Sequence, residues 1–409
     1  MSAVLETALD ACIDALRSSA IDTGDRVGWL SWELDAKGTP ARMVGGHTNL
    51  YDGDAGVAWA LAQLARATDR SDLGDLAERA AATALRSVEG QPFGGLLDSA
   101  TGVVLAAESV AAETVRVADG GLAARSSAAL TSASIDILAT DLTSGLAGLV
   151  LAQSRRPHAS TPEAVRRLAS RASRHPVGVC WVDPLAADER AARPLLGLAH
   201  GNSGIALALA EAASRDERTA DVALPLLRDA LRWEAAWFDP IAGGWPDLRS
   251  DEGGYPTMWC HGAAGIGATR LRLLQLEEGG LDLESASTAV RAEAEAAVQA
   301  CGSELARAAA SIPQFGEAAL LGGLTLCHGL GASLDVLVLA SERGAPRHLD
   351  AARRFAETIV AALPEDPLEW PSGVRAEGSL SLFLGLAGVA VVLARLLHPE
   401  RVASPSLLV

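Results

Sequence analysis

The feature that most constrains the fold is a short glycine pattern that recurs along the chain. A Gly-x-x-Gly pair is followed each time by a stretch of small apolar residues, and complete copies begin at Gly53, Gly145, Gly201, Gly262 and Gly385. Two degenerate copies begin at Ser99 and Gly329, so seven copies follow one another in steps of 46 to 67 residues. A period of this length fits two helices with their connections. The sequence therefore predicts seven helical hairpins.

The two helices of each hairpin differ in their apolar pattern. The segment after each glycine pair is apolar nearly all round, which is typical of a buried helix. Segments with one polar face lie between copies, at Leu73–Arg86, Pro162–Ser173, Ser287–Gln299 and Asp350–Ala362. We expect an all-α fold, an α/α toroid of about seven inner and seven outer helices, with the glycines allowing tight turns and close helix approach.

An open solenoid is the alternative architecture, because it also stacks helix pairs. The last copy is as apolar as the middle ones, whereas a solenoid usually ends in a polar cap, so a closed ring is favoured. We expect a single domain over residues 1–409. Within it, residues 1–48 form an N-terminal outer helical segment and residues 49–409 form the seven repeats.

Composition excludes several classes of protein. Hydrophobic residues make up 49% of the chain, which is too apolar for disorder. The longest apolar run, Leu382–Ala394, is too short to span a membrane. Acidic residues near the N-terminus argue against a signal peptide, so we expect a cytoplasmic protein. The net charge of −17 argues against nucleic acid and anionic membranes. Five cysteines, an odd number, argue against a disulfide framework.

The chemistry-bearing residues fall at two positions just before the glycine pattern. The residues directly before the first position of each copy are Asp52, Asp98, Ser144, His200, His261, His328 and Leu384. One residue further back stand Tyr51, Leu97, Thr143, Ala199, Cys260, Cys327 and Phe383. Because equivalent positions of a closed ring share one rim, we expect these side chains to converge although they are far apart in sequence.

The pairs Cys260-His261 and Cys327-His328 predict a metal site. Two cysteines with one or two histidines offer the ligands that zinc prefers. Either pair alone is more typical of a buried cysteine beside a capping histidine, but two pairs in register with a repeat favour zinc. Two cysteines and one histidine would leave one coordination position open, as in catalytic zinc sites.

Two more residues are candidates for acid–base chemistry. His200 occupies the equivalent position in an earlier copy, where it is a third metal ligand, a general acid or base, or a helix cap. Asp141 lies four residues before its glycine. It can accept a proton, orient a histidine or cap the helix, and taken alone it is more typical of a cap.

With these motifs the sequence resembles the lanthionine synthetase C-like family. The matching segments are Ala199-His200-Gly201, Trp259-Cys260-His261-Gly262 and Leu326-Cys327-His328-Gly329, together with the glycine-rich copies. The Trp-Cys-His-Gly form and the tail from Arg401 to Val409 are similar to the cyclase portion of class II lanthipeptide synthetases. The resemblance covers the chain from about Trp29 onwards.

The resemblance implies an α/α toroid that binds one zinc ion per chain through Cys260, Cys327 and His328. It implies a cyclase that adds peptide cysteine thiols to dehydroalanine or dehydrobutyrine, giving thioether rings in a dehydrated precursor peptide. His200 matches the acid–base histidine of the family, and Asp141 matches its acidic partner.

The sequence also departs from the family. The dehydratase portion of class II enzymes is absent from these 409 residues, so we expect either a stand-alone cyclase with a separate dehydratase partner or a domain of a larger synthetase. Pro256 stands where some cyclases carry an arginine, and His261 where some carry tyrosine. Two other functions remain open. One is a non-catalytic peptide-binding toroid. The other is a different α/α-barrel enzyme that works through paired acids, for which Asp52 and Asp98 are candidates.

Overall fold

The computed structural model describes residues 2–34, 39–91, 93–114, 137, 139–155, 158–184, 193–249, 253–320, 322–374 and 376–408. Helices dominate these residues and the strands are short, in agreement with the predicted all-α class. No helix in these ranges is long and apolar enough to cross a membrane. The chain divides into two compact units. The first comprises Met1–Gln91, Gly102–Ala128 and Gly302–Val409, and the second comprises Pro92–Thr101 and Ala129–Cys301.

The helix after each glycine copy is an inner helix, as the pattern predicts. The inner helices are α2 (Asp54–Thr68), α4 (Ala100–Glu113), α6 (Leu146–Ser154), α8 (Asn202–Arg215), α10 (Ala263–Glu278), α12 (Gly331–Glu342) and α14 (Leu386–Leu397). Every residue of α6 and of α14 is buried. A helix that is apolar all round is stable only when it is covered on all sides, and these helices meet that condition.

The remaining helices are amphipathic and cover the inner ones. They are α1 (Ala3–Ser18), α3 (Ser71–Ser87), α7 (Thr161–Ser170), α9 (Glu217–Ala235), α11 (Ala286–Phe315) and α13 (Arg347–Val360), with short 3₁₀ turns η1 (Gly316–Ala319) and η2 (Pro367–Glu369). In α13 the buried residues are Ala352, Ala356 and Ile359, the spacing of a single helix face. The outer helix expected after the second copy falls within residues 115–136, outside the described residues.

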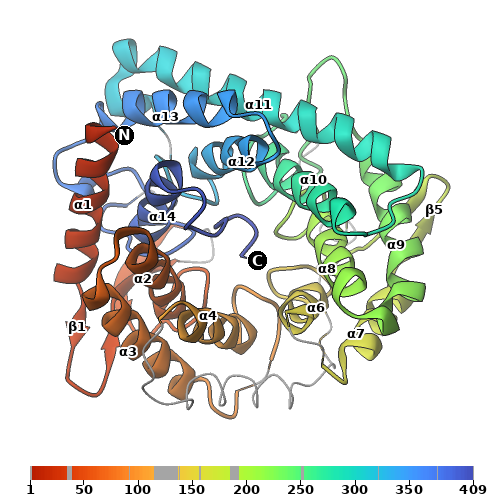
Figure 1. Ribbon diagram of the computed structural model, residues 1–409, viewed down its shortest axis with the longest axis horizontal. Coiled ribbons are helices and arrows are strands. Elements are labelled where there is room, and N and C mark those ends of the chain that lie inside the picture. The colour runs from red at the N-terminus through yellow and green to blue at the C-terminus, as the bar shows by residue number, and fades with distance from the viewer. Residues whose placement is uncertain are drawn as a thin grey trace. The chain divides into compact units, whose positions relative to one another are not determined.

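Each unit contains neighbouring inner helices with their outer partners (Figure 1). In the first unit α14 packs against α2 and α12, while α3 covers α2 and α13 covers α12. The N-terminal helix α1 packs on α14, so the start of the chain covers its last inner helix. In the second unit α8 contacts both α6 and α10, and α9 covers α8. A buried ion pair joins Arg270 of α10 to Glu234 of α9.

The glycine pattern satisfies a need for space rather than for an unusual backbone conformation. Gly201 caps α8 with an extended φ of −110°, which any residue can adopt. A Cβ on Gly265, however, would lie 2.8 Å from Cβ of Leu198, in the neighbouring copy. A Cβ on Gly204 would lie 2.9 Å from Cβ of Leu142 in the same way. The second glycine of a copy therefore lets its helix lie close to the loop of the previous copy, and the sequence predicts this close approach.

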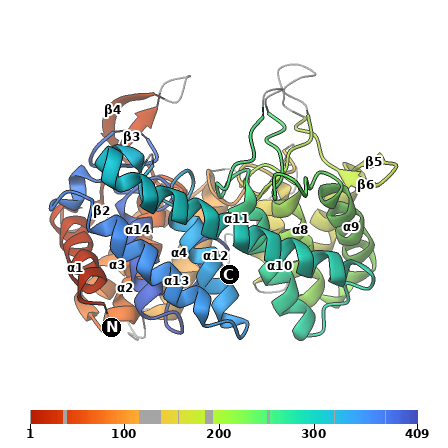
Figure 2. The same cartoon turned by 90° about the horizontal axis from the view of Figure 1, so that it is seen from above.

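Three short β-hairpins lie beside the helices in the described residues. They were not predicted from the sequence. They pair β1 (Ile21–Asp22) with β2 (Val27–Gly28), β3 (Leu30–Leu34) with β4 (Pro40–Gly45), and β5 (Ser173–His175) with β6 (Gly178–Cys180), all antiparallel. Figure 2 shows β3 and β4 projecting from the helices of the first unit. The indole of Trp32 on β3 donates a hydrogen bond to the Glu377 carbonyl, which ties this hairpin down.

One acidic side chain fastens the N-terminal segment to α2. Asp54, the first residue of α2, is only 5% exposed, and its Oδ1 accepts a 2.8 Å hydrogen bond from the Trp29 amide. Burial raises the pKa of Asp54 to about 6, although the Trp29 hydrogen bond and the charge of His47 oppose the shift. An ionised carboxylate at this position is therefore a source of instability at neutral pH.

Candidate metal centre and acid–base pair

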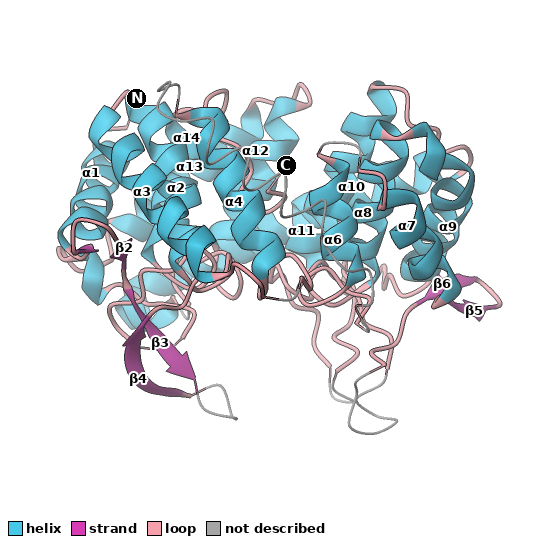
Figure 3. Cartoon of the chain, turned by 90° about the horizontal axis from the view of Figure 1, so that it is seen from below, coloured by secondary structure: helices cyan, strands magenta, loops and turns pink. Residues whose placement is uncertain are grey.

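Main-chain hydrogen bonds hold the loops before the inner helices in register. In the second unit the Leu97 amide donates to the Thr143 carbonyl at 3.0 Å, Thr143 to Ala199 at 3.2 Å, and Ala199 to Cys260 at 3.0 Å. All four are the residues predicted to be equivalent, two positions before their copies. Figure 3 shows the long connecting loops of this unit at one end of α6, α8 and α10.

The first unit has the same arrangement. The Cys327 amide donates to the Phe383 carbonyl at 3.0 Å, and the Phe383 amide donates to Tyr51 at 3.1 Å. The rings of Tyr51 and Phe383 also stack with centroids 5.2 Å apart. Within each unit, then, the sequence register matches a ladder of peptide hydrogen bonds that carries the candidate side chains on neighbouring loops.

His200 and Asp141 form a pair within the second unit. Nδ1 of His200 lies 3.2 Å from Oδ2 of Asp141, and Oδ1 of Asp141 accepts a 2.7 Å hydrogen bond from the Ser144 amide. Asp141 therefore accepts a hydrogen bond within its own turn and lies within hydrogen-bond distance of the histidine, as two of the roles considered from the sequence require. The carboxylate is 13% exposed and the imidazole 52%, so the histidine is the accessible member of the pair.

The charges around His200 favour its protonated form. Burial by itself lowers the pKa of His200. The hydrogen bond and negative charge of Asp141, with added contributions from Cys260 and Asp98, outweigh burial and raise the pKa. Asp98 joins this group through Ser144, whose hydroxyl donates a 2.6 Å hydrogen bond to Oδ2 of Asp98. The histidine is therefore suited to donate a proton near neutral pH.

Cys260 and its neighbour His261 lie in the loop before α10. Nδ1 of His261 is 2.7 Å from Sγ of Cys260. On the other side of the ring, Nε2 of His261 contacts the Arg249 guanidinium, which is also paired with Asp247. Pro256, which stands where some cyclases carry an arginine, has no charge. The positive charge in this loop comes from Arg249 instead. Arg249 and Asp247 could not be predicted from the sequence, since no periodic pattern or motif marks them.

Cys327 and His328 lie in the loop before α12, in the first unit. Sγ of Cys327 is 3.5 Å from Nε2 of His328. The cysteine is 2% exposed, whereas the histidine is exposed. A tetrahedral zinc ion with bonds of about 2.3 Å to sulfur and about 2.0 Å to nitrogen would hold its two donor atoms about 3.5 Å apart. The spacing of this pair therefore fits two ligands of one zinc ion.

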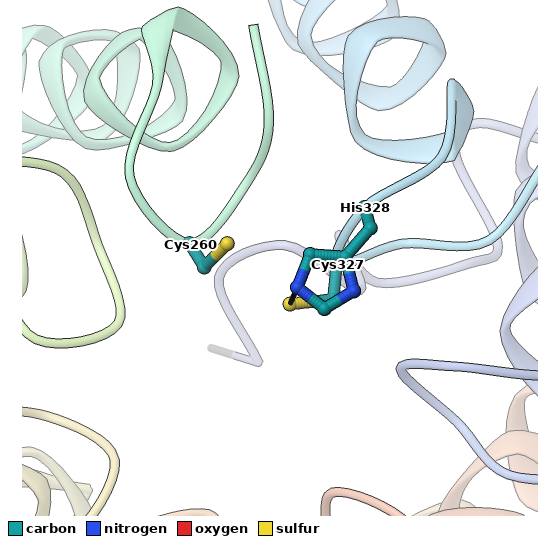
Figure 4. Close-up of side chains that lie close together, drawn as sticks. All are labelled: Cys260, Cys327 and His328. Carbon is teal, nitrogen blue, oxygen red and sulfur yellow. Dashed lines mark hydrogen bonds between the residues drawn. The ribbon is translucent and has the colours of Figure 1, made fainter. Parts of the chain in front are cut away.

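Among the described residues, Cys260, Cys327 and His328 form the group of donor side chains that could hold a metal ion. Figure 4 draws Cys260 on the loop before α10, and Cys327 with His328 on the loop before α12. His261 is not a member of the group, although its sequence position is equivalent to that of His328. Of the five cysteines, Cys12, Cys180 and Cys301 also lie outside it, and all three are buried.

Comparisons with known proteins agree with the fold and with the family resemblance. A family model described as lanthionine synthetase C-like protein matches residues 46–409. Among solved structures, nisin cyclase matches with a TM-score of 0.61 and 12% sequence identity, over 99% of this chain and 96% of that chain. A search of the curated proteins found no match. The structural likeness confirms the predicted fold class, an α/α toroid.

Proposed function

This chain belongs to the lanthionine synthetase C-like family, and we propose that it is a zinc-dependent lanthipeptide cyclase. The reaction is the addition of a peptide cysteine thiol to dehydroalanine or dehydrobutyrine, which forms a lanthionine or methyllanthionine ring. The name of the structurally similar nisin cyclase supports this class of reaction. The observation that carries the proposal is the 3.5 Å spacing of Cys327 Sγ and His328 Nε2, which suits two zinc ligands.

Cys260 supplies the third ligand of the proposed site. Two thiolates and one imidazole are a donor set that zinc prefers to magnesium or calcium. Three protein ligands leave the fourth position for the sulfur of the substrate. Bound zinc would hold that sulfur as a thiolate at neutral pH, the form that attacks an electrophilic alkene.

His200 and Asp141 handle the protons. As the substrate sulfur bonds to the β-carbon of the dehydro residue, the π electrons move to the α-carbon and the carbonyl, and the α-carbon must gain a proton. His200 donates that proton from its imidazolium form. Asp141 orients His200 through Nδ1, which leaves Nε2 to act on the substrate, or takes up the thiol proton. The thiol loses one proton and the α-carbon gains one, so the product has the mass of the substrate.

The substrate is a precursor peptide that has already been dehydrated. Dehydration of serine and threonine residues must precede this reaction, and we propose that a dehydratase supplies the peptide. An acidic enzyme with a net charge of −17 suits a neutral or cationic peptide. We propose a cytoplasmic location for this step.

The test is incubation of the zinc-loaded protein with a dehydrated precursor peptide, followed by thiol alkylation and mass measurement. Ring formation leaves the mass unchanged and removes alkylatable thiols. We expect about one zinc ion per chain in the wild type. Cys327→Ala loses zinc and ring formation together. His200→Asn retains zinc but slows ring formation, by about 10²–10⁴-fold if proton donation is lost.

Cys12→Ala is the matched control. Cys12 is fully buried in α1, and burial raises the pKa of its thiol, which makes it a poor metal ligand. This variant should retain zinc and full activity. Normal ring formation by the zinc-free Cys327→Ala variant would refute the mechanism. A wild-type protein that binds the peptide without zinc and leaves its thiols alkylatable would instead indicate a non-catalytic binding module.

A further inference from the structure

An acidic side chain fixes the Arg249 guanidinium in the loop before α10. Nε of Arg249 donates to Oδ1 of Asp247 at 3.0 Å and Nη2 donates to Oδ2 at 2.8 Å, while the Arg249 amide donates to Oδ1 at 3.0 Å. The Asp247 amide in turn donates to the Gly254 carbonyl at 2.9 Å, which closes the loop. The carboxylate is 18% exposed, so the pair is partly shielded from solvent. A planar guanidinium held at two points presents its remaining N–H groups in a fixed direction.

That direction determines which nitrogen of His261 carries a proton. Nη2 of Arg249 contacts Nε2 of His261. A guanidinium has only donors, so this contact makes Nε2 the acceptor and assigns the imidazole proton to Nδ1. Oδ2 of Asp247 also lies 3.7 Å from Nε2, beyond hydrogen-bond distance. Nδ1 lies 2.7 Å from Sγ of Cys260. The N–H group of His261 therefore points at the sulfur that the proposed function assigns to zinc.

We propose that Asp247 and Arg249 hold His261 as a hydrogen-bond donor to the Cys260 sulfur, and that Arg249 is thereby a positioning residue of the metal site. The inference rests on the proposed function, because it assumes that Cys260 is a zinc ligand. It assigns different tasks to two histidines at equivalent positions. His328 places Nε2 3.5 Å from its cysteine, as a second ligand would, whereas the Nε2 of His261 is taken by Arg249.

The hydrogen bond has a defined chemical effect. An N–H donor at this distance fixes the direction in which the Cys260 sulfur points, as partners of ligating side chains commonly do. Partners of this kind, one shell beyond the ligands, tune metal affinity by about 10–100-fold.

The experiment measures the metal site directly. Zinc affinity is determined by competition with a chelator, and the protein is also loaded with Co²⁺, whose sulfur-to-metal charge-transfer absorption reports on each thiolate ligand. We expect Arg249→Gln and His261→Phe each to weaken zinc binding by about 10-fold or more and to shift the cobalt absorption in the same direction. The double variant should show no further change, because both substitutions remove the same hydrogen bond.

Arg218→Gln is the matched control, since Asp216 and Arg218 form the same Asp-x-Arg pair at the start of α9. It should leave the zinc affinity and the cobalt spectrum unchanged. If Arg249→Gln binds zinc with wild-type affinity and its cobalt spectrum is unshifted, the inference is wrong. Normal ring formation by the wild type would in that case still support the proposed function. A spectrum that responds to Arg249→Gln in a protein that never cyclises a dehydrated peptide would instead refute the proposed function and retain the role of Arg249.

Discussion

Replacing Asp54 with asparagine should stabilise the protein at neutral pH. Asp54 is buried at the start of α2, and its pKa is raised from 3.8 to about 6. A difference of about two pKa units corresponds to about 3 kcal/mol of folding free energy that the ionised carboxylate removes. The asparagine side chain would keep an oxygen to accept the Trp29 amide hydrogen bond and would carry no charge. We therefore expect Asp54→Asn to gain up to about 3 kcal/mol at about pH 7.5.

The sign of the pH dependence follows from the direction of the shift. Because the folded pKa is above the unfolded one, the folded state binds the proton more tightly and is favoured at low pH. The contribution of Asp54 to stability is fully present below pH 3.8 and is lost as the pH rises through about 6. The advantage of the variant over the wild type should thus shrink to less than about 1 kcal/mol at about pH 4.

The assay is denaturant unfolding followed by tryptophan fluorescence at both pH values, with the midpoint and slope compared. Asp216→Asn is a control of opposite sign. The hydrogen bond from Arg218 lowers the pKa of Asp216, so its substitution should destabilise the protein at neutral pH and matter less in acid. A stability gain for Asp54→Asn that is equal at both pH values, or no gain at about pH 7.5, would refute the reasoning.

Two more predictions concern the candidate site. Asp141→Asn removes a hydrogen bond and a charge that raise the pKa of His200, so the pH above which kcat/KM falls should move to a lower value; an unmoved pH–rate profile would contradict the proposed role of the pair. Gly265→Ala should cost about 1–3 kcal/mol and weaken zinc binding, since its Cβ would push against Leu198 and the Cys260 loop. Gly302→Ala is its control. A Cβ there meets nothing within 4 Å, so a gain of about 0.5–1 kcal/mol is expected, and equal losses in both variants would show that steric contact is not the cause.

The sequence was sufficient to predict the inner helices and the register of their loops. The glycine copies mark close approaches of main chain to main chain, such as Gly204 against the Leu198 carbonyl, and few residues other than glycine meet that requirement. A requirement that repeats in five complete copies leaves a clear pattern. For the same reason the equivalence of Thr143, Ala199 and Cys260 could be predicted before their hydrogen bonds were known.

Features that depend on a single tertiary contact left no such pattern. Arg249 lies in an irregular loop, and its contact with His261 follows from the path of that loop rather than from a spacing in the sequence. The hairpins β1–β2 and β5–β6 were missed because their strands have two or three residues, too few to show a period of two, whereas β3 alternates apolar and polar residues and could have been predicted. Helix α11 was expected to end near Gln299 but continues to Phe315, through Gly302 and Pro313.

Peptide hydrogen bonds align the loops before the inner helices, whereas the side chains on these loops provide the reactive groups. Within one unit the ladder passes through Leu97, Thr143, Ala199 and Cys260, four side chains with nothing in common. Amides and carbonyls maintain most of the alignment, to which the Thr143 hydroxyl adds a hydrogen bond to the Ala199 carbonyl. The register therefore depends little on which reactive side chain a rung carries, so a scaffold built in this way can acquire, lose or relocate reactive groups one at a time.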